Sequence, residues 1–218
     1  MPFEVDNVSS LTPFPHAHVD RFTIRQRLKA VKNVYEVRVA LPGDEEGELV
    51  AYVEQKTFAL KEDLRFWADE AKAAEVFRIK ARQRFDPRAR YHVTDADGAE
   101  LGELGKAFRR SLARSTWRIY SPEGEEIAWA AERSLFRSVL RRLMGLAGLI
   151  PLVGNLIELI PILYHFDFYR GDQHVGSLDR RLGFRDRYVL DVSGDVERAI
   201  DRRLAIGLAV AMDALQAR

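Results

Sequence analysis

Apolar and polar residues alternate along most of the chain in short runs, and the runs are separated by polar turns that contain glycine. The pattern is clearest in residues 91–108, 117–136 and 166–184, which all begin with an aromatic residue and a second apolar residue two positions later. Alternation with a period of two is typical of a strand with one buried face, and Asp-Gly or Glu-Gly between two such runs is typical of a hairpin. The sequence therefore predicts a mainly β fold of repeated antiparallel hairpins.

Two further copies of the pattern are looser. One has apolar alternation on both sides of a polar turn at Pro42–Gly47, in Tyr35–Val39 and Leu49–Val53. The other lies around residues 62–76, where abundant Ala, Glu and Lys favour a helix. Its place in the repeat favours a hairpin instead, with Glu70–Glu75 as the turn, and this is the structure that we expect.

The C-terminal segment breaks the repeat. Asp195–Arg218 predicts a helix, with Asp195 as its N-cap and residues 195–216 as its body. The second half, Leu204–Met212, is apolar on every side, which is typical of a helix that is buried all round or lies in a membrane. Nine residues span roughly 13 Å, which is too short to cross a bilayer. We therefore expect an apolar C-terminal helix buried inside a closed β-barrel.

A second break is the apolar segment 143–164, which has the length of a membrane span. Pro151 and Pro161 would interrupt a straight spanning helix, and Glu158 near the middle would be costly in a bilayer without a partner. We therefore expect an insertion between two hairpins rather than a simple membrane span.

Aromatic-led hairpins with Asp-x-Asp-Gly or Glu-Gly turns, followed by a buried apolar helix, resemble the LURP-one-related family. The stretches that carry the resemblance are Tyr91–Lys106, Trp117–Arg133, Tyr188–Asp191 and the helix Asp201–Leu215, and the looser copies extend it over roughly residues 22–215. The family shares the fold of tubby and phospholipid-scramblase proteins, which implies a barrel of about twelve strands around the C-terminal helix. It also implies a non-enzymatic protein linked to membrane lipid, because tubby domains bind phosphoinositides and scramblases are associated with bilayers. The insertion departs from the family pattern, and no binding residue carries over.

We expect two regions in the chain. Residues 1–21 form an extended arm, and residues 22–218 form one barrel domain that contains the apolar insertion and the central helix. The arm lacks a basic start followed by an apolar run, so it does not have the pattern of a secretory signal. Together with the absence of cysteine, this favours a cytoplasmic location, peripheral to the inner face of the membrane.

Composition narrows the possible chemistry. A net charge of +1 gives no overall attraction to polyanions, and nucleic acid is not an expected partner because no recognition-helix or RNA-binding signature is present. The absence of cysteine excludes disulfides, thiolate catalysis and the usual structural zinc sites. The turn at residues 95–98 fits a hairpin rather than a calcium loop, because Val93 and Leu104 would occupy ligand positions. His16 and His18 have no carboxylate at a useful spacing. We therefore assign no catalytic, cofactor-binding or metal-binding residue, and an enzyme is the less favoured class.

Two groups of cations are candidate contacts for anionic lipid. The first alternates with apolar residues on one predicted strand, which places four cations on one face: Arg78, Lys80, Arg82 and Arg84. This row is either a solvated outer face that discourages edge pairing or a stripe that binds phosphate. The second group directly precedes the apolar insertion, as expected beside an anionic membrane surface: Arg137, Arg141 and Arg142.

The insertion contains more apolar side chains than a protein leaves in water. They are Leu146, Leu149, Ile150, Leu152, Val153, Leu156, Ile157, Leu159, Ile160, Ile162 and Leu163. Three structures remain open: a helical hairpin that caps the barrel, a re-entrant or interfacial element in a bilayer, and a surface buried against a second copy or another protein. The leading hypothesis is a non-enzymatic, membrane-associated, lipid-interacting protein whose partner is an anionic phospholipid surface. The alternative is a soluble scaffold that uses the insertion for protein–protein contact or self-association.

Overall fold

A computed structural model describes residues 13–29, 32–56, 63–81, 90–107, 116–133, 165–181 and 187–216 of the chain. These residues form twelve strands, one 3-10 turn and one α-helix. The strands are β1 (Arg21–Lys29), β2 (Lys32–Ala40), β3 (Glu46–Lys56), β4 (Asp63–Trp67), β5 (Glu75–Ala81), β6 (Arg90–Asp95), β7 (Glu100–Ala107), β8 (Thr116–Tyr120), β9 (Glu126–Glu132), β10 (His165–Arg170), β11 (Gln173–Arg181) and β12 (Arg187–Asp191). The turn is η1 (Pro42–Asp44), and the helix is α3 (Arg202–Gln216).

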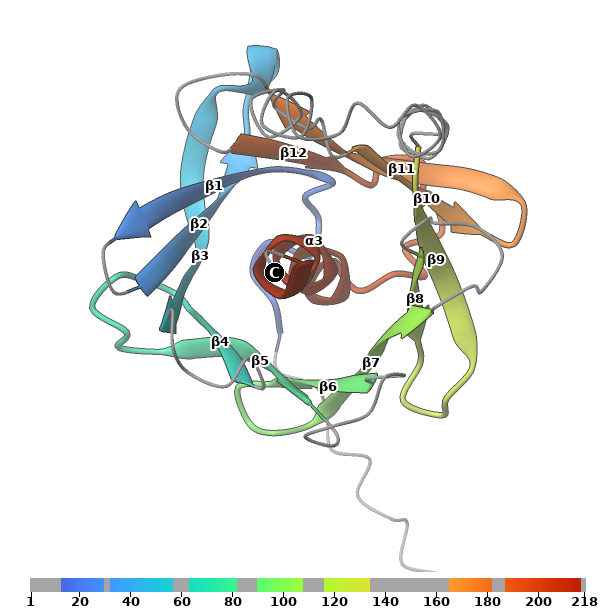
Figure 1. The fold of residues 1–218 in the computed structure, drawn as a ribbon, viewed down its shortest axis with the longest axis horizontal. Coiled ribbons are helices and arrows are strands. Elements are labelled where there is room, and N and C mark those ends of the chain that lie inside the picture. The colour runs from blue at the N-terminus through green and yellow to red at the C-terminus, as the bar shows by residue number, and fades with distance from the viewer. Residues whose placement is uncertain are drawn as a thin grey trace, which may run out of the picture.

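The strands form a closed antiparallel barrel in which each strand pairs with the next one along the chain (Figure 1). The ring closes where β1 pairs with β12, with Phe22 opposite Leu190 and Ile24 opposite Tyr188. In the described residues, each strand therefore has a hydrogen-bonded neighbour on both sides. The predicted mainly β fold of repeated hairpins, closed into a barrel around a C-terminal helix, is confirmed.

Hairpin turns lie where the sequence pattern places them. At the end of β6 the carboxylate of Asp95 accepts hydrogen bonds from the backbone N–H groups of Asp97 (3.1 Å) and Ala99 (2.8 Å). Gly98 has a φ of 86°, a conformation that glycine adopts without strain. The segment around residues 62–76, whose composition favours a helix, also forms a hairpin, because β4 and β5 pair antiparallel. The hairpin interpretation is therefore correct at both places.

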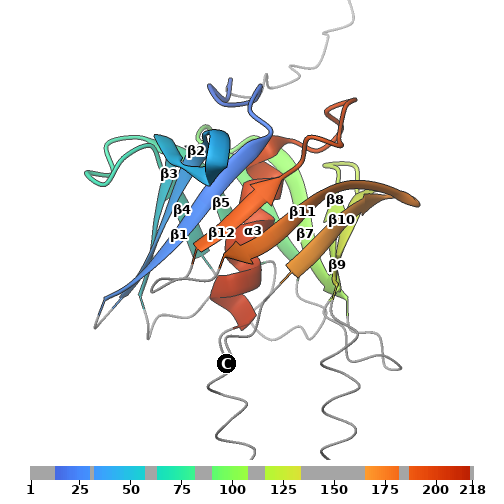
Figure 2. The ribbon, with the colours of Figure 1, turned by 90° about the horizontal axis from the view of Figure 1, so that it is seen from above.

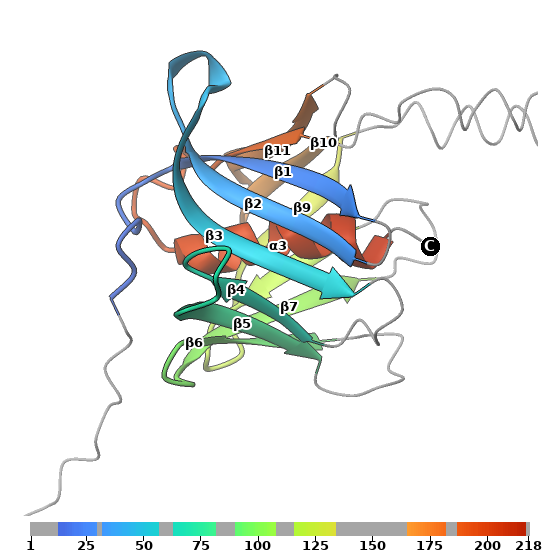
Figure 3. The same cartoon turned by 90° about the vertical axis from the view of Figure 1, so that its left-hand side faces the viewer.

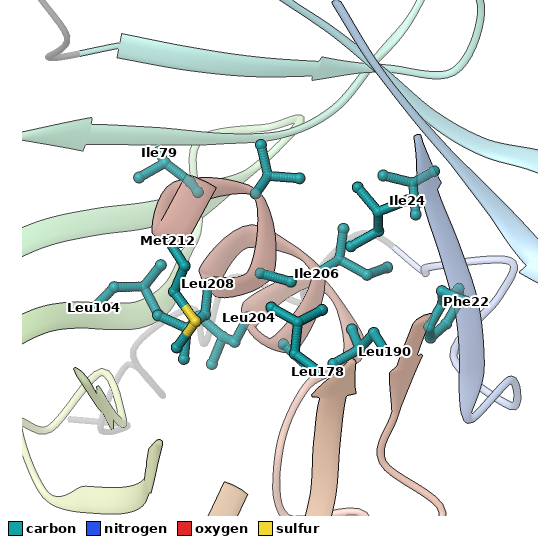
Figure 4. Close-up of a cluster of buried hydrophobic side chains, with 14 of the residues drawn as sticks. Phe22, Ile24, Ile79, Leu104, Leu178, Leu190, Leu204, Ile206, Leu208 and Met212 are labelled. Carbon is teal, nitrogen blue, oxygen red and sulfur yellow. The ribbon is translucent and has the colours of Figure 1, made fainter. Parts of the chain in front are cut away.

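The helix α3 lies inside the ring of strands and runs along its axis, as Figures 1 and 2 show. Every residue from Arg202 to Met212 is buried. Apolar side chains of the helix, such as Leu204 and Leu208, face inward-pointing residues of the strands, such as Leu104 and Leu178 (Figure 4). Burying a large aliphatic side chain stabilises the fold by about 1.5–3 kcal/mol, so this interface is a main source of stability.

The helix begins later than the sequence predicts, at Arg202 instead of Asp195. The carboxylate of Asp195 does bind backbone N–H groups, those of Ala199 (3.1 Å) and Ile200 (3.0 Å), but it closes a turn and not a helix. Asp201 is the actual cap, because its Oδ1 accepts a hydrogen bond of 2.8 Å from the backbone N–H of Arg203. The predicted start was wrong because a side chain that caps a helix can equally close a tight turn.

The described part of the N-terminal arm is also more ordered than predicted. Residues 14–17 form a turn in which the N–H of Ala17 donates to the carbonyl of Phe14 at 3.0 Å. Phe14 is buried, and the guanidinium of Arg203 lies over its ring. This end of the arm therefore packs against the start of α3 and is not extended.

Candidate functional site

The two ends of the barrel carry opposite charge in their connections. Because every strand is antiparallel to the next one, alternate connections leave the barrel at the same end. The connections at the end where α3 finishes are 30–31, 57–62, 82–89, 108–115, 134–164 and 182–186, and their sequences contain 11 Lys or Arg and 4 Asp or Glu. We call this end of the barrel the basic end. The connections at the other end are 41–45, 68–74, 96–99, 121–125, 171–172 and 192–201, with 2 Lys or Arg and 11 Asp or Glu.

Arg78 and Lys80 are the two predicted contact residues that the structure describes, and both lie on the outer face of β5. Their neighbours Phe77 and Ile79 are buried inside the barrel, so the predicted alternation is correct. Lys80 is exposed. Arg78 already has a strong anionic partner, since its Nε donates to Asp63 Oδ1 at 2.6 Å and its Nη2 contacts the second oxygen. Of the two residues, Arg78 is therefore already paired with a carboxylate of the barrel wall.

The ion pair between Asp63 and Arg78 shifts the pKa of both groups. Partial burial pushes the pKa of Asp63 upward, but the hydrogen bond and charge of Arg78, helped by Arg65 and Lys80, hold it below its usual value. The same hydrogen bond raises the pKa of Arg78. Asp63 is consequently a carboxylate at neutral pH and competes with any external anion for the Arg78 guanidinium.

The remaining predicted contact residues lie outside the described residues. They are Arg82, Arg84, Arg137, Arg141 and Arg142, and all eleven apolar residues of the insertion from Leu146 to Leu163. Among the helical residues that the structure describes, none forms a segment long and apolar enough to cross a membrane.

Both ends of the segment 134–164 are held by one cluster of charged residues on the outer face. The backbone N–H of Arg133 donates to the carbonyl of His165 at 2.8 Å, and the Arg133 side chain donates to Asp167 at 2.9 Å. Asp179 lies 2.8 Å from His165 Nδ1 and 3.4 Å from Arg133. The Arg133 hydrogen bond also lowers the pKa of Asp167. The two residues that flank the segment, Arg133 directly after β9 and His165 at the start of β10, are thus held side by side.

A polar network inside the barrel holds the last turns of α3 at the basic end. The O–H of Tyr35 donates to Asp213 Oδ2 at 2.9 Å, and the O–H of Tyr188 donates to Asp213 Oδ1 at 2.6 Å. Gln26 donates to the Tyr35 oxygen at 3.1 Å. Burial, and next to it the charge of Asp213, raise the pKa of Tyr35 far above 10, so its phenol stays a neutral donor. This network was not predicted, because Tyr35 and Asp213 are far apart in the sequence.

A corresponding network holds the start of α3 at the opposite end. Arg202 donates to Asp195 Oδ2 at 2.8 Å and to Asp20 Oδ1 at 2.6 Å. The Arg202 and Asp195 side chains are almost completely buried. The central helix is therefore fixed at both ends by charged residues, which leaves the apolar contacts between them in a defined register.

One group of side chains has the composition of a metal site. His92 Nδ1 lies 3.0 Å from Glu100 Oε1 and 3.5 Å from Glu103 Oε1 on the outer face of β6 and β7. Arg90, however, donates to the other oxygen of Glu103 at 2.7 Å. A guanidinium beside the ligands opposes a divalent cation by charge repulsion, so we assign the group to surface ion pairing.

The architecture defines a class of protein: a closed twelve-stranded antiparallel barrel with its own C-terminal helix along the axis. A family model described as LURP-one-related matches residues 49–213, well over half of the chain. The chain belongs to the LURP-one-related family. The match begins within β3, although β1 and β2 complete the same ring. A comparison with curated proteins finds no match.

Proposed function

We propose that this protein is a non-enzymatic, membrane-associated protein that binds anionic lipid with the basic end of its barrel. The main observation in support is the unequal distribution of charge between the two sets of connections. One end has an excess of 7 cations and the other an excess of 9 acids. Each Lys or Arg near an anionic leaflet contributes about 1 kcal/mol, so an excess of this size favours one orientation strongly. The acidic connections would face away from the membrane.

The apolar insertion belongs, in sequence, to one of the connections counted at the basic end. It connects β9 to β10, and its flanking residues Arg133 and His165 are held together at that end. In this proposal Arg137, Arg141 and Arg142 contact lipid headgroups, while the apolar residues from Leu146 to Leu163 enter the hydrocarbon layer. Basic residues that precede an apolar segment are typical of membrane surfaces.

Two further features support a binding role over catalysis. The barrel interior, where a carrier or enzyme would need a cavity, is occupied by buried side chains of α3 in the described residues. Two polar groups that the strands direct inward near the basic end, those of Tyr35 and Tyr188, are engaged with the helix through Asp213. Arg78 contributes less to lipid binding than its charge suggests, because Asp63 already neutralises it.

The test is co-sedimentation of the full chain with phosphatidylcholine vesicles that either contain or lack phosphatidylserine. Salt is varied from about 0.1 M to about 1 M, which shortens the Debye length from about 10 Å to 3 Å. We expect the protein to pellet with anionic vesicles at low salt and to be released partly at high salt, since the apolar contribution is not screened. A variant lacking residues 143–163 should stay in the supernatant.

Charge-matched variants separate a local contact from a change in net charge. The triple variant R137Q/R141Q/R142Q should lose most of the anionic-vesicle binding. The control variant R65Q/R118Q/R170Q removes three arginines from the described barrel wall and should bind as the wild type does. If no form pellets, and the full chain instead shows a mass that grows with concentration and falls on deletion of 143–163, the segment is a protein interface and the lipid proposal is wrong.

A further inference from the structure

Three arginines lie directly opposite one another across three strands of the barrel wall. Arg25 on β1 is opposite Arg187 on β12, and Arg187 is in turn opposite Arg181 on β11. Arg21 lies on the same outer face of β1 as Arg25. Like charges directly opposite on neighbouring strands destabilise a sheet, so this row requires anions nearby. The row also crosses the junction at which the barrel closes. We call these four residues the arginine seam.

The anions come from the tip of the β2–β3 hairpin, which extends beyond the ring of strands (Figure 3). Asp44 accepts hydrogen bonds from Arg21 (2.7 Å) and Arg181 (2.5 Å), and its backbone carbonyl contacts Arg187. Glu46 lies 3.4 Å from Arg25 and 3.9 Å from Arg187. The hairpin tip thus supplies two carboxylates to a surface built from three other strands.

The hairpin tip does not satisfy the seam. Among the described residues, four guanidinium groups face three carboxylates, the third being Asp191, which lies 3.1 Å from Arg21 Nε. The Nε atoms of Arg21 and Arg187 are both buried and have no acceptor with hydrogen-bond geometry in the described structure. A buried donor without an acceptor is costly, and a carboxylate has only two oxygens to offer. A phosphate group has more acceptor oxygens and a higher charge, and it matches the forked donors of arginine.

We propose that the arginine seam is a binding site for a phosphate group and that the Asp44 carboxylate takes the place of the ligand until a phosphate displaces it. The hairpin tip would then lift away, which Gly43 assists as the residue before Asp44 in a tight turn, with φ values of 76° and 62°. Without Asp44 and Glu46, Asp191 would be the remaining carboxylate for the four arginines in the part of the wall that the structure describes. This site uses the described barrel wall and is independent of the segment 143–164 on which the lipid proposal rests.

The probe is inorganic phosphate, titrated into the full chain and followed by calorimetry at low ionic strength. The variant D44N keeps the size of the side chain but removes the competing charge. It should bind phosphate at least about tenfold more tightly than the wild type, because an internal competitor reduces the apparent affinity to the fraction of sites that it leaves free. The variant R181Q/R187Q should bind no phosphate. The control E126Q releases Arg118, an arginine of the barrel wall outside both proposed sites, from its ion pair and should leave phosphate affinity unchanged.

Circular dichroism establishes that each variant is folded before titration. If D44N is folded and binds phosphate no more tightly than the wild type, or if E126Q gains as much, the proposal is overturned and Asp44 only holds the closed barrel together. Vesicles that contain a phosphoinositide distinguish the source of the phosphate: tighter binding of D44N than of the wild type to these vesicles, with equal binding of both to phosphatidylserine vesicles, identifies a lipid headgroup. Loss of vesicle binding on deletion of 143–163 without loss of phosphate binding would uphold this site separately from the lipid proposal.

Discussion

Replacing Arg202 with methionine tests whether the charged residues at the start of α3 hold the helix in place. The Arg202 side chain is 2% exposed and that of its partner Asp195 is 0% exposed, with 2.8 Å between Nη1 and Oδ2. Methionine fills much of the same volume but leaves the Asp195 carboxylate buried without its cation. Asp20 is 32% exposed and can return to water. The stability lost in this variant therefore comes mainly from the unpaired carboxylate of Asp195.

Removing one partner of a buried ion pair typically costs about 3–5 kcal/mol. Asp195 keeps the backbone hydrogen bonds of Ala199 and Ile200, so we expect the R202M variant to lose about 3 kcal/mol. This is a large part of the roughly 5–15 kcal/mol that stabilises a domain. By contrast, Arg118 and Glu126 are 41% and 34% exposed, and the control R118M should lose no more than about 1 kcal/mol.

Urea unfolding of the full chain, followed by circular dichroism, measures these changes as differences in the free energy of unfolding. The double variant R202M/D195N provides a further check, because the second substitution removes the isolated charge. Its loss should be clearly smaller than the sum of the two single losses. If R202M is as stable as R118M, or if the single losses simply add, Asp195 and Arg202 are not a coupled buried pair and the reasoning fails.

Three other substitutions or conditions test the barrel interior. The G207V variant should lose about 1–3 kcal/mol in urea unfolding, because a Cβ on Gly207 would lie 2.9 Å from Ile79 Cδ1 in a packed core; unchanged stability would indicate looser packing. The D213A variant should lose about 2–4 kcal/mol by the same measurement, because two phenols lose a charged acceptor, and a loss below about 1 kcal/mol would contradict this role. Burial raises the pKa of Tyr35 and Tyr52 far above 10, so the folded state keeps two protons that the unfolded chain releases above pH 10. Stability should therefore fall as pH rises above 10, by about 1.4 kcal/mol per pH unit for each tyrosine, and Y35F should show a shallower decline; equal slopes would refute the assignment.

The barrel was predictable because its information is local. Each hairpin has its own alternation and its own turn residue, such as Gly98 or Gly124, and these signals need no knowledge of distant contacts. The burial of α3 followed from Leu204–Met212, which are apolar on all sides. The start of the helix was missed because Asp195 can form the same backbone hydrogen bonds in a turn as in a cap.

The contacts that shape the candidate sites were not predictable in the same way, because they depend on strand register and on closure of the ring. The contact between Asp63 and Arg78 is the exception, because it lies within the predicted hairpin at residues 62–76. In that hairpin Arg65 is opposite Arg78 and Asp63 is opposite Lys80, so Asp63 and Arg78 are diagonal neighbours. Asp44 has no such local signal. It meets Arg181 only because the first and last strands are neighbours in the closed barrel.

The position of α3 constrains the order in which the protein can fold. The helix is the last element of the described chain, yet every strand surrounds it. During synthesis the ring cannot close before the helix leaves the ribosome, because β1 must wait for β12 and the interior must still admit α3. All twelve strands precede the helix in the sequence and therefore remain without it while the chain grows, and long-range pairing of this kind is slow and prone to aggregation. Assembly depends on a helix that follows every strand in the sequence, so a chain that stops before Arg202 lacks the centre of the molecule.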